Sequence, residues 1–385
     1  MEPEDFCAEG GDEMRCTRLT LALGLVLLLA SGLGQVGAQG TQDPKALADL
    51  YARLPFQDVY PIPDGPIMID GKVRPIKIGF SQTGFGHPWR IEMINSARAE
   101  VARHPNVQLI VTDGKVDVVK QSGDIADLLA QGVDAIVMSP VEDAGLRAAT
   151  RKVMKAKIPI VALDRDVSAD KTLFMGQSNV TMAAAVARVL VEHLTKKYGK
   201  PMGNVVEITG LIGSTPAQGR HEGFVSVVKN YPDIKILATG DGQWIREPAV
   251  KLMEDWLVRF PKIDAVFAHA EESSWGAQLS IERAGRKNEG IMHFTHDAAN
   301  QGFCSVKAGL FLADGNYTPY LGHIGVRAVL YSLMAKELTN KKNYAYGFKY
   351  DLPDSPVVTP TNVEQWLGRS WGTWNKDTCG KYFIP

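Results

Sequence analysis

Hydrophobic positions along the chain alternate between short apolar runs and longer segments with helical spacing, from residue 76 to beyond residue 310. Short apolar runs bounded by turn residues predict buried strands, whereas apolar positions three and four apart predict amphipathic helices. Regular alternation of the two predicts right-handed crossovers and a parallel sheet covered by helices on both faces. Because the alternation forms two series, we expect an α/β fold with two doubly wound parallel-sheet lobes joined by a hinge.

The two series divide the chain into expected elements. First-series strands are expected at 76–81, 107–112, 135–139 and 160–164, with helices at 89–103, 118–131 and 144–156. Second-series strands are expected at 205–209, 234–239, 265–269, 291–296 and 310–313, with helices at 182–198, 218–230, 247–258, 274–284 and 300–307. A further helix at 321–338 and an extended segment at 357–360 follow both series. We therefore expect more than one crossing between lobes and a candidate hinge near Ser178 and Asn179.

These patterns predict a division into five parts. They are a signal peptide at 1–38, an N-terminal extension at 39–75 wrapped on the surface, lobe I at 76–178 plus about 318–345, lobe II at 179–317 plus about 346–362, and a C-terminal tail at 363–385.

The N-terminal part resembles a secretory leader. Arg15 and Arg18 precede an apolar run at 19–30, and Val36-Gly37-Ala38 is a small-residue cleavage site. The apolar run is too short to span a bilayer comfortably. Six acidic residues precede Met14, so translation starts either at Met1 or at Met14. Cleavage of the leader predicts a periplasmic protein.

Composition and cysteine count restrict the function further. The chain has 385 residues, 45% hydrophobic and 22% charged, as in ordinary globular proteins, and its length favours two domains. A net charge of −1 favours neither nucleic acid nor membrane surfaces as partners. After removal of the leader only Cys304 and Cys379 remain. In an oxidising compartment we favour one disulfide between them over two buried thiols.

The segment 158–166, IPIVALDRD, is central to the interpretation. A fully apolar strand that ends at Asp164 and Arg165 is typical of a buried parallel strand that delivers polar groups to its carboxyl end, where ligands bind in open α/β sheets. Asp164 can accept and Arg165 donate hydrogen bonds to hydroxyls of a small polar molecule. The alternative is a surface ion pair that caps the strand.

The turn 81–90 follows the first expected strand. Gly84 and Gly86 begin a dinucleotide-binding pattern, but Trp89 occupies the place of the third glycine and would obstruct the pyrophosphate, so we reject a nucleotide site. Trp89 either stacks on the apolar face of a sugar ring or is a core aromatic of the following helix, since it shares a face with Met93 and Ala97.

Other expected strand ends also carry polar or aromatic residues. Arg220 begins a helix after the first second-lobe strand, Trp244 follows the second, and Asp297 ends the fourth. The segment 210–220 lacks both a Walker phosphate loop and a hydrolase Gly-x-Ser-x-Gly elbow. Asp164 and Asp297 resemble a glycosidase carboxylate pair, but the nearby arginines should keep both ionised, whereas a general acid needs a raised pKa.

We expect neither metal nor cofactor. His293 and His296 are three residues apart on an expected strand, so their side chains point to opposite faces, and no His-Glu-x-x-His occurs.

Four motifs together resemble the periplasmic sugar-binding proteins of ATP-driven importers, of the ribose and galactofuranose type, which share the type I periplasmic binding protein fold. The motifs are IGFSQ at 78–82, GVDAI at 132–136 with Ser139-Pro140, IPIVALDR at 158–165 and GRHEGF at 219–224. The resemblance covers about 76–360 and implies two lobes that close on a monosaccharide between aromatic rings, with Asp and Arg groups reading its hydroxyls.

The resemblance also assigns expected site residues. Ligand-binding positions of the family fall on His87, Trp89, Arg90, Asp164, Arg165, Arg220, Trp244, Asp297 and, near the hinge, Tyr317. Two positions depart from the family pattern, Ala270 in place of a sugar-contacting Asn and His296 in place of an aromatic or small residue. We expect these two to bear on the identity of the ligand.

The sequence therefore predicts a monomeric, non-enzymatic periplasmic protein that captures a monosaccharide and delivers it to a separate ABC permease and ATPase. Alternatives are a binding protein for a polyol or another small polar solute, and a sensor or chemoreceptor protein of the same fold. A carbohydrate-active enzyme would need an acid/base pair, and a repressor would need a helix-turn-helix before the first lobe.

Overall fold

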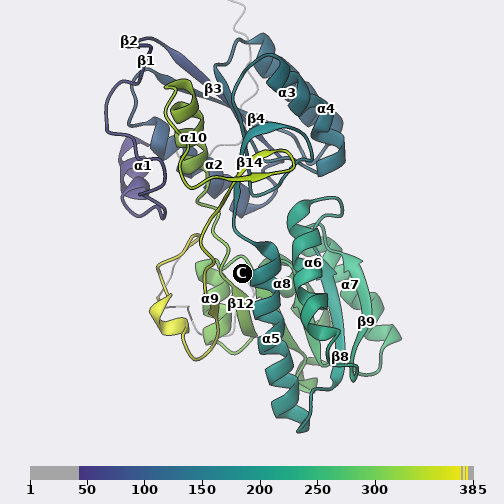
Figure 1. Ribbon diagram of the computed structural model, residues 1–385. Helices are drawn as coiled ribbons and strands as arrows, with labels where there is room; N and C mark the ends of the chain where they lie inside the picture. Colours follow the sequence, from purple (N-terminus) through teal and green to yellow (C-terminus); the bar gives the residue numbers. More distant parts are fainter. Residues whose placement is uncertain (1–42, 374–375, 378, 380–385) are drawn as a thin grey trace, which may run out of the picture. The chain divides into compact units, whose positions relative to one another are not determined.

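Two mainly parallel β-sheets, one in each lobe, organise the residues that this computed structural model describes, namely 43–373, 376–377 and 379 (Figure 1). The predicted signal peptide lies outside these residues. The predicted α/β fold with two doubly wound lobes is confirmed. No helix in the described part of the chain combines the length and apolar character needed to cross a bilayer.

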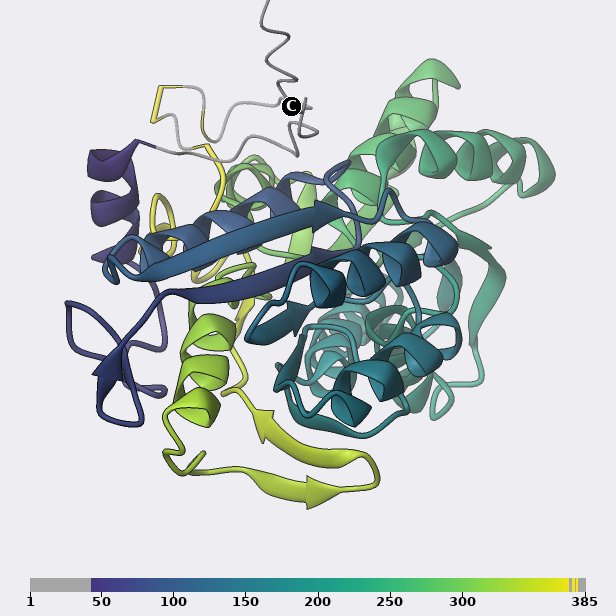
Figure 2. The same ribbon diagram turned by 90° about the horizontal axis from the view of Figure 1, so that it is seen from above.

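Lobe I contains the seven-stranded sheet, in the order β13-β14-β7-β6-β5-β3-β4. Neighbouring strands are parallel except in the β13–β14 hairpin, which forms the lower edge in Figure 2. The strands are β3 (Ile76–Gln82), β4 (Val107–Asp113), β5 (Ala135–Met138), β6 (Ile160–Leu163), β7 (Lys171–Gly176), β13 (Lys342–Tyr344) and β14 (Gly347–Asp351).

Helices cover both faces of this sheet, so its central strands are apolar on both sides. On β5, Val137 joins the apolar cluster under α1, α2 and α10, whereas its neighbour Ile136 joins the cluster under α3 and α4. The helices are α1 (Pro44–Tyr51), α2 (Pro88–Val101), α3 (Val118–Ala130), α4 (Asp143–Lys155) and α10 (Gly322–Leu333).

Lobe II contains the six-stranded sheet, in the order β15-β12-β11-β10-β8-β9, in which only β15 is antiparallel to its neighbour. Helices α5 and α6 cover one face, and α7 and α8 cover the other. The elements are β8 (Gly203–Thr209), β9 (Ile234–Asp241), β10 (Ala265–Ala268), β11 (Met292–His296), β12 (Phe311–Gly315), β15 (Val357–Val358), α5 (Asn179–Tyr198), α6 (Thr215–Val228), α7 (Arg246–Arg259), α8 (Glu271–Arg283) and α9 (Asn300–Lys307).

The chain passes between the sheets three times, between β7 and α5, between β12 and α10, and between β14 and β15. The assignment of all of 346–362 to lobe II is wrong, because β14 pairs with β7 of the first sheet. Sequence patterning missed β7 because it carries alternating rather than continuous burial and starts with Lys171. It assigned β14 to the wrong lobe because that strand is only partly buried and has no apolar run.

The N-terminal segment 43–75 is part of the lobe I core. The sequence, by contrast, predicts an extension that is only wrapped on the surface. Leu47 and Leu50 of α1 are buried in the core of that lobe. The buried Arg327 of α10 donates from Nη1 to the carbonyl oxygens of Phe56, Gln57 and Val59, at 3.2–3.4 Å. The segment therefore supplies both apolar area and the acceptors that a buried guanidinium needs. It ends in the short hairpin β1 (Met68–Ile69) and β2 (Lys72–Val73).

Candidate functional site

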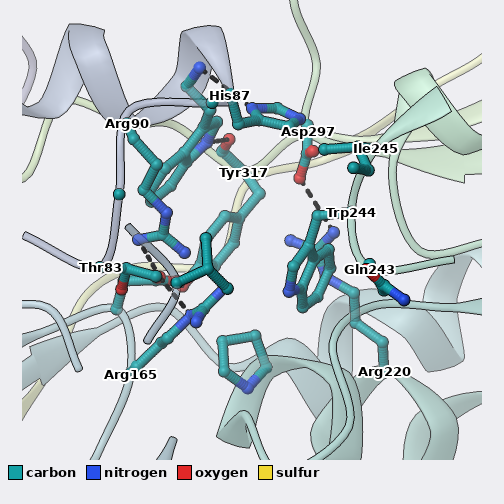
Figure 3. A pocket seen from close by; sticks show the side chains of 16 residues that line it. Thr83, His87, Arg90, Arg165, Arg220, Gln243, Trp244, Ile245, Asp297 and Tyr317 are labelled. Atoms are coloured by element: carbon teal, nitrogen blue, oxygen red, sulfur yellow. Dashed lines mark hydrogen bonds and ion pairs between the residues drawn. The ribbon is translucent and has the colours of Figure 1, made fainter. Parts of the chain in front are cut away.

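A cavity of about 220 Å³ lies among side chains from both lobes, at the carboxyl ends of their strands (Figure 3). Ligands of open α/β sheets bind at this edge, because chain reversals there present side chains and amides outside the sheet. The cavity is lined by Thr83, Gly84, Gly86, His87, Trp89, Arg90, Val116, Asp164, Arg165, Pro216, Arg220, Gln243, Trp244, Ile245, Asp297 and Tyr317.

Both lobes contribute through the residues that follow their strands. In lobe I, His87 caps the N-terminus of α2 after β3, and Asp164 follows β6. In lobe II, Trp244 follows β9 and Asp297 follows β11. Tyr317 lies on the connection after β12, between the two lobes.

Three of these residues have left-handed backbone conformations, with φ values of 66° for Asp164, 70° for Trp244 and 110° for Asp297. Such a conformation costs about 1–3 kcal/mol for a residue other than glycine and persists only where the surroundings fix it. Trp244 is accommodated because its ring lies against Gly210, where any Cβ would overlap it. The cavity therefore contains strained backbone, and two further lining residues, Val116 and Gln243, also have positive φ values.

Asp164 is held by two donors. Its Oδ2 accepts a hydrogen bond from Arg90 Nη1 at 2.8 Å, and its Oδ1 accepts one from the Tyr317 hydroxyl at 2.7 Å. Arg165 is buried as well and donates from Nη1 to the Val141 carbonyl oxygen at 2.7 Å. Its Nε has no hydrogen-bond partner in the described structure. The alternative of a surface ion pair is thus excluded, because Asp164 and Arg165 are both buried, with Arg165 Nε 3.8 Å from Asp164 Oδ2.

The lobe II part of the network continues from Tyr317. Asn179 donates from Nδ2 to the Tyr317 hydroxyl at 3.4 Å and accepts from Arg220 Nε at 2.9 Å. Arg220 Nη1 in turn donates to Asp297 Oδ1 at 2.9 Å and to the His269 carbonyl oxygen. One hydrogen-bonded chain therefore links Asp164 of lobe I to Asp297 of lobe II.

Burial controls the charge of two cavity residues. It raises the pKa of Asp297 to about 6, although Arg220 acts to lower it, so this carboxyl is still mainly ionised at pH 7 but titrates well above the usual range of an aspartate. Burial, with Arg90 and Arg165 adding to it, lowers the pKa of His87 to about 3. His87 is therefore neutral at pH 7, and its Nδ1 accepts the Trp89 backbone N–H at 3.1 Å.

The two expected stacking aromatics differ. Trp89 is buried, stacks on the Tyr317 ring at 5.7 Å between centroids, and donates from Nε1 to the Tyr317 carbonyl oxygen at 3.1 Å. Trp89 is therefore a core aromatic of α2 that also lines the cavity. Trp244 is only partly buried, with the guanidinium carbon of Arg220 5.2 Å from its ring centre.

The cavity brings together nine of the sequence-predicted residues, but not Ala270 and His296. Ala270 is fully buried before α8, and His296 Nδ1 bonds the Ala268 carbonyl oxygen at 2.9 Å within the sheet. The expectation that they bear on ligand identity therefore has no direct contact to support it. Sequence reasoning missed seven lining residues, whose only signal was their position after strands or at a helix start, namely Thr83, Gly84, Gly86, Val116, Pro216, Gln243 and Ile245.

The cysteines and His293 were also considered as candidate functional residues. Cys304 of α9 forms a disulfide with Cys379. His293 bonds Gln278 through Nε2 at 3.0 Å and is buried. The described residues contain no group of three His, Cys, Asp or Glu side chains placed to hold a metal ion.

Two α/β lobes with a polar and aromatic cavity between their strand ends define the class of two-lobed solute-binding proteins. Residues 78–339 match the periplasmic binding protein domain model, and the chain belongs to that family.

Individual proteins similar to this chain bind different small polyhydroxylated molecules, according to their names. The galactofuranose-binding protein YtfQ of Escherichia coli strain K12 is 32% identical over 55% of this chain and 68% of its own length. A xylitol-binding protein of Mycolicibacterium smegmatis is 30% identical over 55% of this chain and 59% of its own length. The structure of the fructose-binding periplasmic domain of hybrid two component system BT1754 is 28% identical and covers 76% of this chain and 93% of its own, with a TM-score of 0.69.

Proposed function

We propose that this protein is a periplasmic solute-binding protein that captures a monosaccharide between its lobes and delivers it to an ABC importer. The observation that carries the proposal is the hydrogen-bonded chain from Arg90 and Asp164 through Tyr317 to Arg220 and Asp297, which surrounds one cavity. A sugar presents hydroxyls that both donate and accept, and this chain supplies carboxylate acceptors next to guanidinium donors.

Ligand capture follows from the distribution of these groups over two lobes. A ligand that bonds Asp164 of lobe I and Asp297 of lobe II gains the full set of contacts only when the lobes are close, so it shifts a hinge equilibrium toward the closed form. Charge-assisted hydrogen bonds of this kind contribute about 1.5–3 kcal/mol each. The half-buried Trp244 supplies a ring face for the apolar side of the sugar.

The proposal includes location and partners. Because the family is periplasmic and the leader pattern precedes the mature chain, the protein acts in the periplasm as a monomer, with the permease and ATPase as separate chains. It performs no catalysis. Incubation of purified protein with sugar derivatives should give no turnover beyond one equivalent, and multiple turnover would establish an enzyme.

A thermal-shift screen of protein from Gln39 onward, unfolded and refolded to remove carried ligand, tests the proposal. Pentoses, hexoses, polyols and amino acids are compared at 1 mM. Ligand at about a thousand times its dissociation constant adds about 4 kcal/mol of stability. A selective rise of the melting midpoint with one sugar supports the proposal. A rise with an amino acid alone, or no rise with any compound of the panel, contradicts it.

Two other functions have specific support. The xylitol-binding relative favours a polyol ligand as the alternative, and a selective shift with a polyol would establish it. The fructose-binding sensor domain favours a receptor partner instead of a permease. Co-purification tests the partner: recovery of a permease supports the importer function, whereas recovery of a membrane receptor supports the sensor function.

A further inference from the structure

The segment 297–300 carries the cavity residue Asp297, and its backbone is unusual. Asp297 and Ala298 have φ values of 110° and 57°, which only glycine adopts readily. Two such residues in succession need external contacts to keep this conformation.

Lobe II supplies the partners for the amides of this segment. The Asp297 N–H donates to the Gly315 carbonyl oxygen at 3.0 Å. The Ala298 N–H donates to Asp314 Oδ1 at 3.1 Å, and the Ala299 N–H donates to Glu271 Oε1 at 2.8 Å.

The C-terminal tail supplies partners for the carbonyl oxygens. Trp371 Nε1 donates to the Asp297 carbonyl oxygen at 2.7 Å, and Ser370 Oγ donates to the Ala298 carbonyl oxygen at 2.5 Å. Asn300 fastens the tail in return, through its N–H to the Trp371 carbonyl oxygen at 2.8 Å and its Nδ2 to the Ser370 carbonyl oxygen at 2.8 Å. Trp371 is only 4% exposed, so its hydrogen bond is protected from water.

We propose that the tail segment 370–372 is a positioning element for ligand recognition, in which Trp371 and Ser370 hold the backbone that aims Asp297 into the cavity. The inference rests on the proposed function and adds a role for a segment that lies outside the matched family domain at 78–339. The two peptide planes on either side of Ala298 are each bonded at the N–H within lobe II and at the carbonyl oxygen to the tail, so loss of the tail contacts leaves each plane held at its N–H alone and able to tilt. Asp297 then leaves the orientation in which it pairs with Arg220.

The disulfide reinforces this arrangement. Cys304 belongs to α9, the helix that starts at Asn300, and Cys379 lies seven residues beyond Gly372, whose carbonyl oxygen accepts a hydrogen bond from Asn300 Nδ2 at 3.1 Å. The tail is therefore tied to α9 both by the hydrogen bonds of Asn300 and by the disulfide, which limits how far the tail can separate from the segment when single hydrogen bonds open.

Two tail tryptophans allow a matched comparison. Trp371→Phe removes the donor to Asp297, whereas Trp366→Phe makes the same chemical change where Nε1 has no hydrogen-bond partner in the described structure. Ser370→Ala removes the second donor without the loss of an aromatic ring. Far-ultraviolet circular dichroism and the melting midpoint verify that each variant folds.

The first measurement needs no ligand. Amide hydrogen exchange of the segment 297–303 should accelerate about two- to tenfold in Trp371→Phe and Ser370→Ala, the factor expected for one lost hydrogen bond, and should stay unchanged in Trp366→Phe. Equal exchange in all three variants, or equal acceleration in the Trp366→Phe control, would overturn the proposal.

The second measurement is calorimetric titration with D-ribose, D-galactose and xylitol, with Asp297→Ala as the reference. Affinity for the probe that binds should fall about two- to tenfold in Trp371→Phe and Ser370→Ala but not in Trp366→Phe, and the Trp371 effect should vanish in the Asp297→Ala background. If Asp297→Ala weakens binding but the tail variants bind like wild type, the positioning role is wrong and the site stands. If Asp297→Ala binds like wild type, the proposed site itself is wrong.

Discussion

Asp164 is a single cavity residue that positions hydrogen-bond donors from two parts of the chain. Its two carboxylate oxygens are shared between Arg90 and the Tyr317 hydroxyl, so it fixes the donors of lobe I and of the connection to lobe II at once. A carboxylate oxygen can accept more than one hydrogen bond, which leaves it capacity for a ligand hydroxyl.

Asp164→Asn should weaken sugar binding at least about tenfold, because it replaces a charge-assisted acceptor by a neutral amide of the same size. Titration calorimetry measures the affinity, and the exposed Asp170→Asn is the control of equal chemistry in the same lobe. Wild-type affinity in Asp164→Asn would mean that the ligand binds elsewhere.

Asp297 should make binding dependent on pH. Its pKa of about 6 means that the carboxylate is the main form at pH 7 and the neutral acid is the main form at pH 5. If the ligand bonds the ionised form, affinity falls as pH decreases through 6, whereas Asp297→Asn binds weakly with a flat profile. Affinities of both proteins from pH 5 to 8 test this, and parallel profiles would contradict it.

At the scale of elements, the ends of β11 and β12 and the start of α8 form a buried acidic junction. Glu271 and Asp314 are both buried, and each accepts an amide of the segment after Asp297. Burial raises the pKa of Glu271 well above its usual value, with Asp314 adding to it. Although Glu271 acts to lower it, burial also raises the pKa of Asp314 to about 7. Asp297 adds to this effect, Arg220 opposes it, and burial keeps nearby His296 neutral.

This junction contributes a part of the free energy of unfolding that falls as pH rises from about 5 to 8. The buried histidines contribute with the opposite sign, because their lowered pKa values make the unfolded state bind more protons below about pH 6.5. The folded state holds a proton that carboxyls of the unfolded chain release near pH 4, so the folded state binds more protons in this window and loses up to about 1.4 kcal/mol per pH unit and proton. Urea denaturation at pH 5 and pH 8 measures the difference. The free energy of unfolding at pH 8 minus that at pH 5 should be more positive in Asp314→Asn than in wild type, and an equal difference would contradict the assignment.

At the scale of the whole molecule, each lobe is assembled from separated parts of the chain. Lobe I combines 43–177 with α10, β13 and β14, and lobe II combines 178–315 with β15 and the tail. Three connections therefore join the lobes, which permits hinge motion without tearing either sheet. The N-terminal helix belongs to this assembly, since it completes the lobe I core.

Leu50→Ala should lower the free energy of unfolding by about 2–5 kcal/mol, because Leu50 is 3% exposed in the lobe I core. Sugar affinity should stay unchanged, since the residue does not line the cavity. Urea denaturation measures the change, with the exposed Asp49→Ala on the same helix as control. Equal stabilities of the two variants would show that α1 does not stabilise the lobe.

Most elements near the cavity were predictable because buried parallel strands and their helices have strong hydrophobic patterns. The strand before Asp164 and Arg165 is an example, because its apolar run and abrupt polar end are local properties. β7 and β14 were not predictable in the same way, since β7 starts with Lys171 and has no continuous buried run, β14 is only partly buried, and the two strands pair with each other although they are distant in sequence.

The sequence by itself determined the two α/β series, the strand ends that carry the cavity residues, and the family, because these depend on local periodicity and on short motifs. Only the tertiary structure decided the shared partners of Asp164, the raised pKa of Asp297, the internal positions of Ala270 and His296, and the contact of Trp371 with Asp297. These depend on burial and on contacts between residues far apart in the chain, and neither quantity is encoded in the local pattern around a single residue.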